Sequence, residues 1–191
     1  MTGKKIYNII LGSASPRRRA LLEEMGIPFR IVRIDFPEEN FPSHLYREEI
    51  ALYLAAEKSK HFGNLAENDL LITADTIVWH NDTVLGKPLH YSDAFQMLKR
   101  LSNQCHDVIT GVCLRSSEKT HCFFAETKVK FADVSNDDIK TYIEKYKPFD
   151  KAGAYGIQEW IGLIGIEWVQ GSYFNVVGLP THRLFVELQN F

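Results

Sequence analysis

Three consecutive arginines, Arg17 to Arg19, stand directly after Pro16 in the stretch GSASPRRR. Ser15 and Pro16 are residue types that begin helices, so the arginines should occupy a first helical turn. Exposed cations are unfavourable there by about 0.3–1 kcal/mol each, because the helix dipole places positive charge at that end. Free backbone N–H groups and guanidinium groups would together suit a phosphate. The alternative is a solvated basic turn in which Arg19 pairs with Glu23.

The spacing also predicts that at least one of these arginine side chains is buried. Arg17 and Arg18 lie one turn before Leu21 and Leu22, so at least one of them should point toward the buried side of the helix. Because an unpaired buried guanidinium group is costly, it would need a carboxylate or a ligand.

Asp75 stands between two apolar runs, residues 70–72 and 77–79. We expect it at the end of a core strand or inside one, and strand ends are where ligands bind in open α/β sheets. Beside bound phosphates, a carboxylate could take a proton from an attacking water or hold a divalent metal. A turn-forming aspartate bonded to nearby backbone is the alternative.

Two lysines could reach a phosphate. Lys58 falls on the apolar side of the helix predicted over residues 46–62, so it either snorkels to water or reaches into a pocket. Lys87 is held in the stiff sequence Gly86-Lys87-Pro88. For each lysine, plain solvation is the alternative.

Gln158 ends a glycine-rich segment, residues 150–158. Glycines let the backbone approach a ligand, and the Gln side chain offers both a donor and an acceptor to the edge of a base. The alternative is a surface loop with a solvated Gln158. Glu38 and Glu39, in the loop after the second predicted strand, could likewise simply be solvated. The chain contains no P-loop, no G-x-G-x-x-G after a strand and no G-x-S-x-G sequence.

Strand-like and helix-like segments alternate, which predicts an α/β protein with a mixed sheet and flanking helices. The predicted strands cover residues 6–11, 29–34, 70–74, 77–85 (a hairpin turning at Asn81-Asp82), 108–114 and 121–131. The predicted helices run from Pro16 to Gly26, over 46–62, from a Ser92 cap to Leu101, from a Ser135 cap to Tyr146, and over 181–188.

The composition excludes several classes of protein. The chain has 191 residues, 45% of them hydrophobic, and a net charge of −2. This slightly acidic charge argues against a protein that binds nucleic acid or an anionic membrane, because either would favour an excess of basic residues. No apolar run approaches the roughly 20 residues of a membrane span, and the start does not read as a signal peptide. The histidines lack zinc-ligand spacing. We expect Cys105, Cys113 and Cys122 to be small buried residues of a reduced, cytosolic protein.

Taken together, six segments resemble the Maf family of nucleotide pyrophosphatases, in order along most of the chain. They are SASPRR (Ser13 to Arg18), EKS around Lys58, ADTIV (Ala74 to Val78), GKP (Gly86 to Pro88), DKAGAYGIQ (Asp150 to Gln158) and GSYFNVVGLP (Gly171 to Pro180). The resemblance implies a single domain over residues 1–191, with a mixed twisted sheet and two lobes around a deep cleft, as in inosine triphosphatases. It also implies a cytoplasmic enzyme that cleaves nucleoside triphosphates between the α and β phosphates, with Mg2+ or Mn2+ as cofactor.

The resemblance assigns a role to each matching position. It implies that Asp75 is the general base for water, a metal ligand or both, and that Glu38 is a second cleft carboxylate at the metal. The phosphate-binding positions it implies are Ser13, Arg18, Lys58 and Lys87, and those for substrate choice are Arg17, Thr76 and Gln158. The combination PRR, ADT and GIQ resembles the branch that acts on dTTP and UTP rather than on 7-methyl-GTP. Glu159 departs from the pattern, because many relatives carry glycine there.

Rival functions stay open at this point. The resemblance also links Maf proteins with arrest of septum formation, so the chain could be a nucleotide sensor that regulates cell division. Modified pyrimidine triphosphates could be the cellular substrate of the same reaction. The 12% aromatic content could serve single-stranded nucleic acid, but the acidic balance speaks against it. The expected partner is therefore a small-molecule nucleotide, with no nucleic acid and no membrane, and a homodimer is left open.

Overall fold

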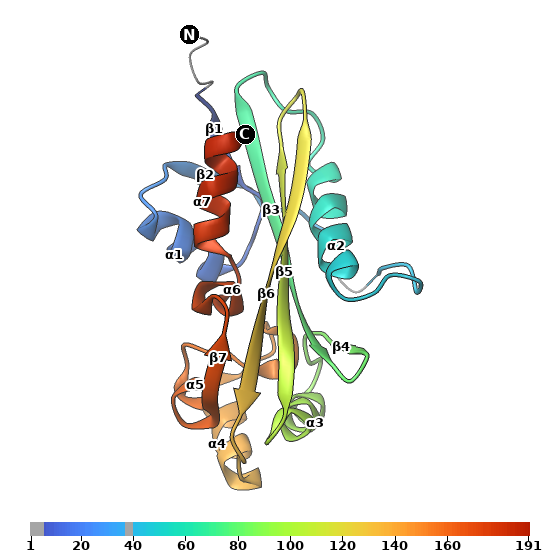
Figure 1. Cartoon of the computed structure of the whole chain (residues 1–191), viewed down its shortest axis with the longest axis vertical. Helices are drawn as coiled ribbons and strands as arrows, with labels where there is room; N and C mark the ends of the chain where they lie inside the picture. Colours follow the sequence, from blue (N-terminus) through green and yellow to red (C-terminus); the bar gives the residue numbers. More distant parts are fainter. Residues whose placement is uncertain (1–5, 37–39) are drawn as a thin grey trace. The chain divides into compact units, whose positions relative to one another are not determined.

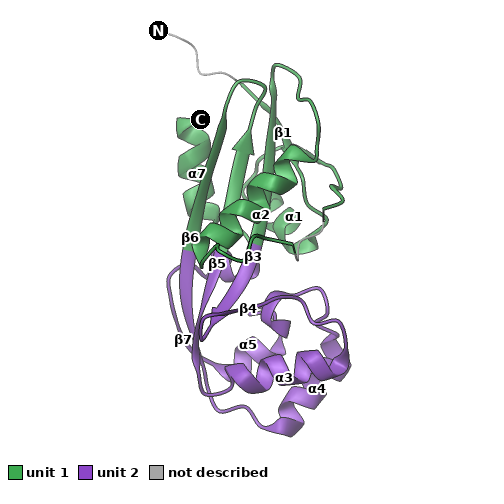
Figure 2. Cartoon of the chain, turned by 90° about the vertical axis from the view of Figure 1, so that its right-hand side faces the viewer, with its two compact units in different colours: residues 1–75, 110–125, 178–191 green, residues 76–109, 126–177 purple. Residues whose placement is uncertain are grey.

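The computed structural model describes residues 6–36 and 40–191. Its chain divides into two compact units, shown in green and purple in Figure 2. Unit 1 comprises residues 1–75, 110–125 and 178–191, and unit 2 comprises residues 76–109 and 126–177. Two compact units can belong to one domain, so the single domain expected over residues 1–191 stays a prediction.

The elements alternate as the sequence predicts (Figure 1). The strands are β1 (Asn8–Leu11), β2 (Phe29–Ile31), β3 (Asp69–His80), β4 (Thr83–Leu85), β5 (Cys105–Arg115), β6 (Thr120–Phe131) and β7 (Ile166–Gln170). The helices are α1 (Pro16–Glu24), α2 (Glu48–Lys60), α3 (Tyr91–Leu101), α4 (Asn136–Tyr146), the 3-10 turn η1 (Ala152–Ala154), α5 (Trp160–Gly165), α6 (Tyr173–Val177) and α7 (Thr181–Asn190).

The strands form one mixed sheet in the order β2-β1-β3-β5-β6-β7, with β4 paired to β3. β1 is parallel to β2 and to β3, whereas β4 and β7 are antiparallel to their neighbours. A mixed sheet with flanking helices confirms the predicted fold class.

In unit 1, α2 and α7 cover opposite faces of the strands. A Cβ atom on Gly111 of β5 would lie 2.3 Å from the Ala51 carbonyl oxygen, so glycine is what allows α2 to approach this closely. On β6, the Phe123 ring lies 5.8 Å from the Arg183 guanidinium group of α7, and the preceding Cys122 contacts Cys113 on the α2 side. Alternation along a strand places these two neighbours on opposite faces.

Unit 2 has its own hydrophobic core, formed by α3, α4, η1 and the strands beside them. The Tyr155 ring packs edge-on against Phe131, with ring centroids 5.0 Å apart, and its hydroxyl lies 2.7 Å from Nε2 of the buried His106. Burial is the main cause that lowers the pKa of His106 to about 3, and His80 nearby acts in the same direction. His106 is therefore neutral at neutral pH.

Several details differ from the sequence prediction. After Tyr146 only the closing helix was predicted, whereas the structure also has α5, β7 and α6 there. β3 runs without interruption through Asp75, whereas a strand ending at Ala74 was expected. Helix α3 begins at Tyr91, so Ser92 lies inside its first turn. The Asp93 carboxylate there accepts the His90 backbone N–H at 2.9 Å.

The cysteines also differ from the prediction that all three are buried. Cys113 is buried, whereas Cys105 is exposed at the start of β5 and Cys122 is half-buried. The prediction is therefore confirmed for Cys113 and wrong for Cys105, and Cys122 is only partly buried.

Candidate functional site

The first turn of α1 is built where β1 ends beside β3. The Gly12 N–H donates to the Ile72 carbonyl at 2.8 Å, and the chain then leaves the sheet. Ser13 is buried, and its Oγ accepts the Ser15 N–H at 3.2 Å. The Ser15 hydroxyl in turn accepts the Arg18 backbone N–H at 3.4 Å, which confirms the predicted N-cap.

The arginines of this turn have different surroundings. Arg18 is 8% exposed, and its Nε donates to the Gly178 carbonyl, ahead of α7, at 2.8 Å. Arg19 is exposed, and its Nε lies 2.8 Å from the Glu23 carboxylate. Arg17 is intermediate. The expectation that at least one of Arg17 and Arg18 faces the buried side is confirmed by Arg18, and Arg19 makes the solvated pair expected for it.

Lys58 and Asp75 lie on the same side of β3. The Thr73 hydroxyl donates to the Ala55 carbonyl of α2 at 2.7 Å, so the β3 face that carries Thr73 lies against α2. Asp75 shares that face because side chains alternate along a strand. Lys58 follows Ala55 by one turn, and helical side chains point back toward the preceding turn.

Both charged groups are withdrawn from water, since Lys58 is 4% and Asp75 is 7% exposed. Buried charges must be paired or bind a ligand. An ammonium group and a carboxylate on one side of one strand can hold a phosphate next to a proton acceptor.

The remaining predicted positions belong to unit 2. Thr76 follows Asp75 directly in β3 and is half-buried. Lys87 is exposed, in a segment that the Gly153 N–H ties down by donating to the Gly86 carbonyl at 3.0 Å. The structure thus brings the GKP segment and the glycine-rich segment together. Gln158, at the end of the latter, is exposed.

A buried network, which sequence reasoning missed, fixes the end of the glycine-rich segment. The Tyr142 hydroxyl donates to the Glu159 carboxylate and accepts the Gly156 N–H at 3.0 Å. Nζ of Lys151, which is 7% exposed, lies 2.7 Å from Asp150 and 3.1 Å from Glu159. Burial raises the pKa of Tyr142, as does its bond to Glu159, so the hydroxyl keeps its proton as a donor.

Glu159, which departs from the family pattern, is thus an anchor of the loop next to Gln158. The only sequence signal for this network was the charged pair Asp150-Lys151 in an otherwise apolar and glycine-rich segment.

Carboxylates for a metal are sparse in the part of the chain that the structure describes. It contains no group of three or more His, Cys, Asp or Glu side chains that could hold an ion. Asp75 is described, whereas Glu38 lies outside the described residues.

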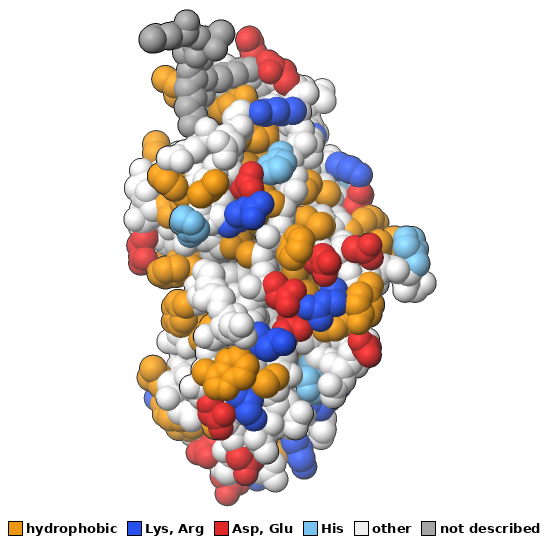
Figure 3. Space-filling model, in the orientation of Figure 1, with side chains coloured by type: hydrophobic (Ala, Val, Ile, Leu, Met, Phe, Trp, Pro, Cys, Tyr) orange, Lys and Arg blue, Asp and Glu red, His pale blue; other side chains and the backbone are white. Residues whose placement is uncertain are grey.

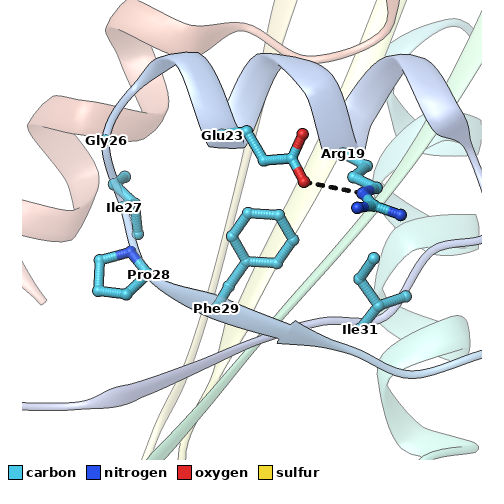
Figure 4. A pocket seen from close by; sticks show the side chains of 7 residues that line it. All are labelled: Arg19, Glu23, Gly26, Ile27, Pro28, Phe29 and Ile31. Atoms are coloured by element: carbon cyan, nitrogen blue, oxygen red, sulfur yellow. Dashed lines mark hydrogen bonds and ion pairs between the residues drawn. The ribbon is translucent and has the colours of Figure 1, made fainter.

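A hollow between α1 and β2, with a volume of about 650 Å3, contains none of the predicted site residues (Figure 4). Its lining residues are Arg19, Glu23, Gly26, Ile27, Pro28, Phe29 and Ile31.

The surface charges are mixed. Figure 3 shows acidic and basic side chains interspersed over the visible face, an arrangement that offers a polyanion no continuous basic surface there. Among the described residues, no helix has both the length and the apolar character needed to cross a membrane.

Comparisons with known proteins cover nearly the whole chain. The sequence model of a family described as "Maf-like protein" matches residues 8–191. A dTTP/UTP pyrophosphatase of Phocaeicola vulgatus is 52% identical over 96% of this chain and 95% of its own length. One of Flavobacterium psychrophilum is 51% identical over 100% of this chain and 98% of its own.

A solved structure shows the same fold at low sequence identity. A HAM1 protein from Coxiella burnetii matches with a TM-score of 0.51 at 13% identity, covering 97% of this chain and 100% of its own. The predicted inosine-triphosphatase-like fold is thereby confirmed, while the cleft between two lobes stays a prediction.

Proposed function

Because the chain belongs to the family of Maf-like proteins, we propose that it is a nucleoside triphosphate pyrophosphatase that hydrolyses dTTP and UTP. The products are the nucleoside monophosphate and pyrophosphate. The observation that carries this proposal is the identity of about half of all residues with dTTP/UTP pyrophosphatases, over almost the full length of both chains. Modified pyrimidine triphosphates would be further substrates of the same reaction.

The triphosphate is bound by cationic side chains. Arg18 and Lys58 supply charge, and Ser13 supplies a hydroxyl at the start of α1. Lys87 supplies a further ammonium group. The burial of Arg18 and Lys58 supports this role, because charge interactions are stronger where water is excluded.

Asp75 acts as the general base. It takes a proton from the attacking water while the α–β phosphoanhydride bond breaks and pyrophosphate leaves. Its place on the Lys58 side of β3 supports this assignment, since the carboxylate then faces the bound phosphates. Arg17, Thr76 and Gln158 select the base, and the Tyr142–Glu159 network holds the loop that ends at Gln158.

A divalent cation, Mg2+ or Mn2+, completes the proposed site. Mg2+ bound with a nucleotide takes one or two protein carboxylates and obtains its remaining ligands from phosphates and water. Asp75 alone satisfies that requirement, so the described residues fit the cation without a larger carboxylate cluster. When bound, the cation neutralises phosphate charge.

The test is pyrophosphate release from dTTP, UTP, CTP, ATP, GTP and 7-methyl-GTP, with Mg2+ or Mn2+ and with a chelator as control. We expect dTTP and UTP to be the best substrates and the chelator to abolish turnover. Nucleotide binding without pyrophosphate release in any of these reactions would contradict the proposal and favour a nucleotide sensor. Preferred hydrolysis of 7-methyl-GTP would contradict the roles of Arg17, Thr76 and Gln158.

A further inference from the structure

Cys113 and Cys122 lie opposite each other on β5 and β6, within unit 1. The two strands form a tight hairpin in which the Ser116 N–H donates to the Lys119 carbonyl at 2.9 Å (Figure 1). Counting back from that hydrogen-bonded pair places Cys113 opposite Cys122, at a position without cross-strand backbone bonds. The Cα atoms of such a pair are about 4.5 Å apart, within the range of about 4.4–6.8 Å found for disulfide-bonded cysteines.

The surroundings favour a thiolate at Cys113, whereas the hydrogen bond to Cys113 and burial both raise the pKa of Cys122. A hydrogen bond from the Cys122 thiol lowers the pKa of Cys113 to about 7, against the opposing effect of burial. The Ser59 hydroxyl, 3.5 Å from the Cys113 Sγ, and the positive charges of Arg115 and Lys60 act in the same direction as Cys122. The thiolate is the form of cysteine that takes part in disulfide exchange.

The two sulfurs differ in their access to solvent. Cys113 is 0% exposed, whereas Cys122 is half-buried and so reachable from outside. Cys122 can therefore meet a small reagent, and Cys113 can then act on it from inside. Ser59, which contacts Cys113, directly follows Lys58 in α2, so the pair adjoins the helical turn that carries a proposed phosphate ligand.

We propose that Cys113 and Cys122 are a reversible oxidation site that exchanges with a low-molecular-weight disulfide such as oxidised glutathione. Cys122 gives its thiol proton to the Cys113 thiolate as its sulfur attacks one sulfur of the reagent, which forms a mixed disulfide and releases one glutathione thiolate. Cys113 then loses that proton to the released glutathione, and its thiolate attacks the Cys122 sulfur, forms the Cys113–Cys122 bond and releases the second glutathione thiolate. The reagent is reduced by two electrons and the cysteine pair is oxidised by two, while one proton passes from the pair to the first glutathione and water protonates the second.

The experiment treats the whole protein with oxidised glutathione at mildly alkaline pH and measures its mass before and after dithiothreitol. Non-reducing tryptic digestion cleaves after Arg115 and Lys119 and so leaves peptides 101–115 and 120–128 joined only by the disulfide. Because Cys105 shares peptide 101–115 with Cys113, fragmentation of the linked pair by mass spectrometry then locates the bond. We expect the protein to lose the mass of two hydrogens, to yield one linked Cys113–Cys122 peptide pair, and to regain that mass with dithiothreitol. Cys105→Ser, the matched control, should retain this bond.

The single variants test the order of attack. Cys113→Ser should accumulate a glutathione adduct on Cys122, whereas Cys122→Ser should leave Cys113 unmodified because it is buried. Wild-type protein that carries only glutathione adducts, or no modification, would overturn the proposal. So would a fragmentation spectrum of the linked pair that places the bond on Cys105. Because the wild-type peptide map decides the question, a variant that fails to fold does not affect the result.

Discussion

The Thr73 hydroxyl on β3 donates a 2.7 Å hydrogen bond to the Ala55 carbonyl on α2. This bond shows which face of β3 lies against α2, and Asp75 and Lys58 lie on that same side of the strand. The proposed chemistry depends on that placement.

Thr73→Val tests the placement. The substitution keeps the shape of the side chain but leaves the buried Ala55 carbonyl without its donor, at a cost of about 1–3 kcal/mol in the free energy of unfolding. We also expect the KM for dTTP to rise, because Lys58 is one turn away on α2. Urea unfolding and steady-state kinetics measure the two effects. Thr83→Val, at an exposed position, is the control, and equal losses in both variants would contradict the prediction.

Arg18 and Arg19 should respond differently to alanine substitution. Arg18 is buried beside Gly178, so Arg18→Ala removes a charge-assisted phosphate contact, and the KM for dTTP should rise about tenfold or more. Arg19 pairs with Glu23 in solvent, so Arg19→Ala should change the KM by less than about twofold. A larger effect at Arg19 than at Arg18 would reverse the two assignments.

Tyr142→Phe should loosen the loop next to Gln158. The variant removes the donor to Glu159 and the acceptor of the Gly156 N–H, which should destabilise the protein by about 1–3 kcal/mol in urea unfolding. Tyr146→Phe serves as the control, because it removes a hydroxyl from the ring that stacks on Tyr142, with ring centroids 5.1 Å apart. If Tyr142→Phe were no less stable than Tyr146→Phe, the network would not anchor this loop.

His106 should make stability sensitive to acid. Burial lowers its pKa to about 3 in the folded state, whereas an unfolded histidine has a pKa of about 6.5. Between those values the unfolded chain binds the additional proton, so stability is lost as the pH falls, by up to about 3 kcal/mol at about pH 4. Unfolding free energies at several pH values, compared with those of His106→Gln, isolate this contribution. A parallel pH dependence in the two proteins would exclude His106 as its source.

Local signals predicted most of the fold. Ser15 and Pro16 begin α1, and Ser135 accepts the Asp138 N–H at 3.1 Å as an N-cap should. The end of the β3 strand was predicted wrongly because aspartate is uncommon inside strands. The backbone ladder needs only N–H and C=O groups, so the strand continues through Asp75.

The site was less accessible to sequence reasoning. Spacing showed that Arg17 or Arg18 must face inward, but only the contact with Gly178, 160 residues away in the chain, distinguishes them. Likewise, the role of Glu159 could not be read from its sequence neighbours, because its partner Tyr142 lies in α4. Contacts between segments distant in sequence decide both cases, and a local pattern carries no information on them.

The most direct measurement is the turnover of dTTP by Asp75→Asn, together with its dissociation constant for dTTP. The variant keeps the size of the side chain but cannot accept the proton of the attacking water. We predict that kcat falls by a factor of about 100 or more, as expected when a general base is removed, while the dissociation constant stays within about threefold of the wild-type value. Near-normal turnover in Asp75→Asn would contradict the central role given to this carboxylate.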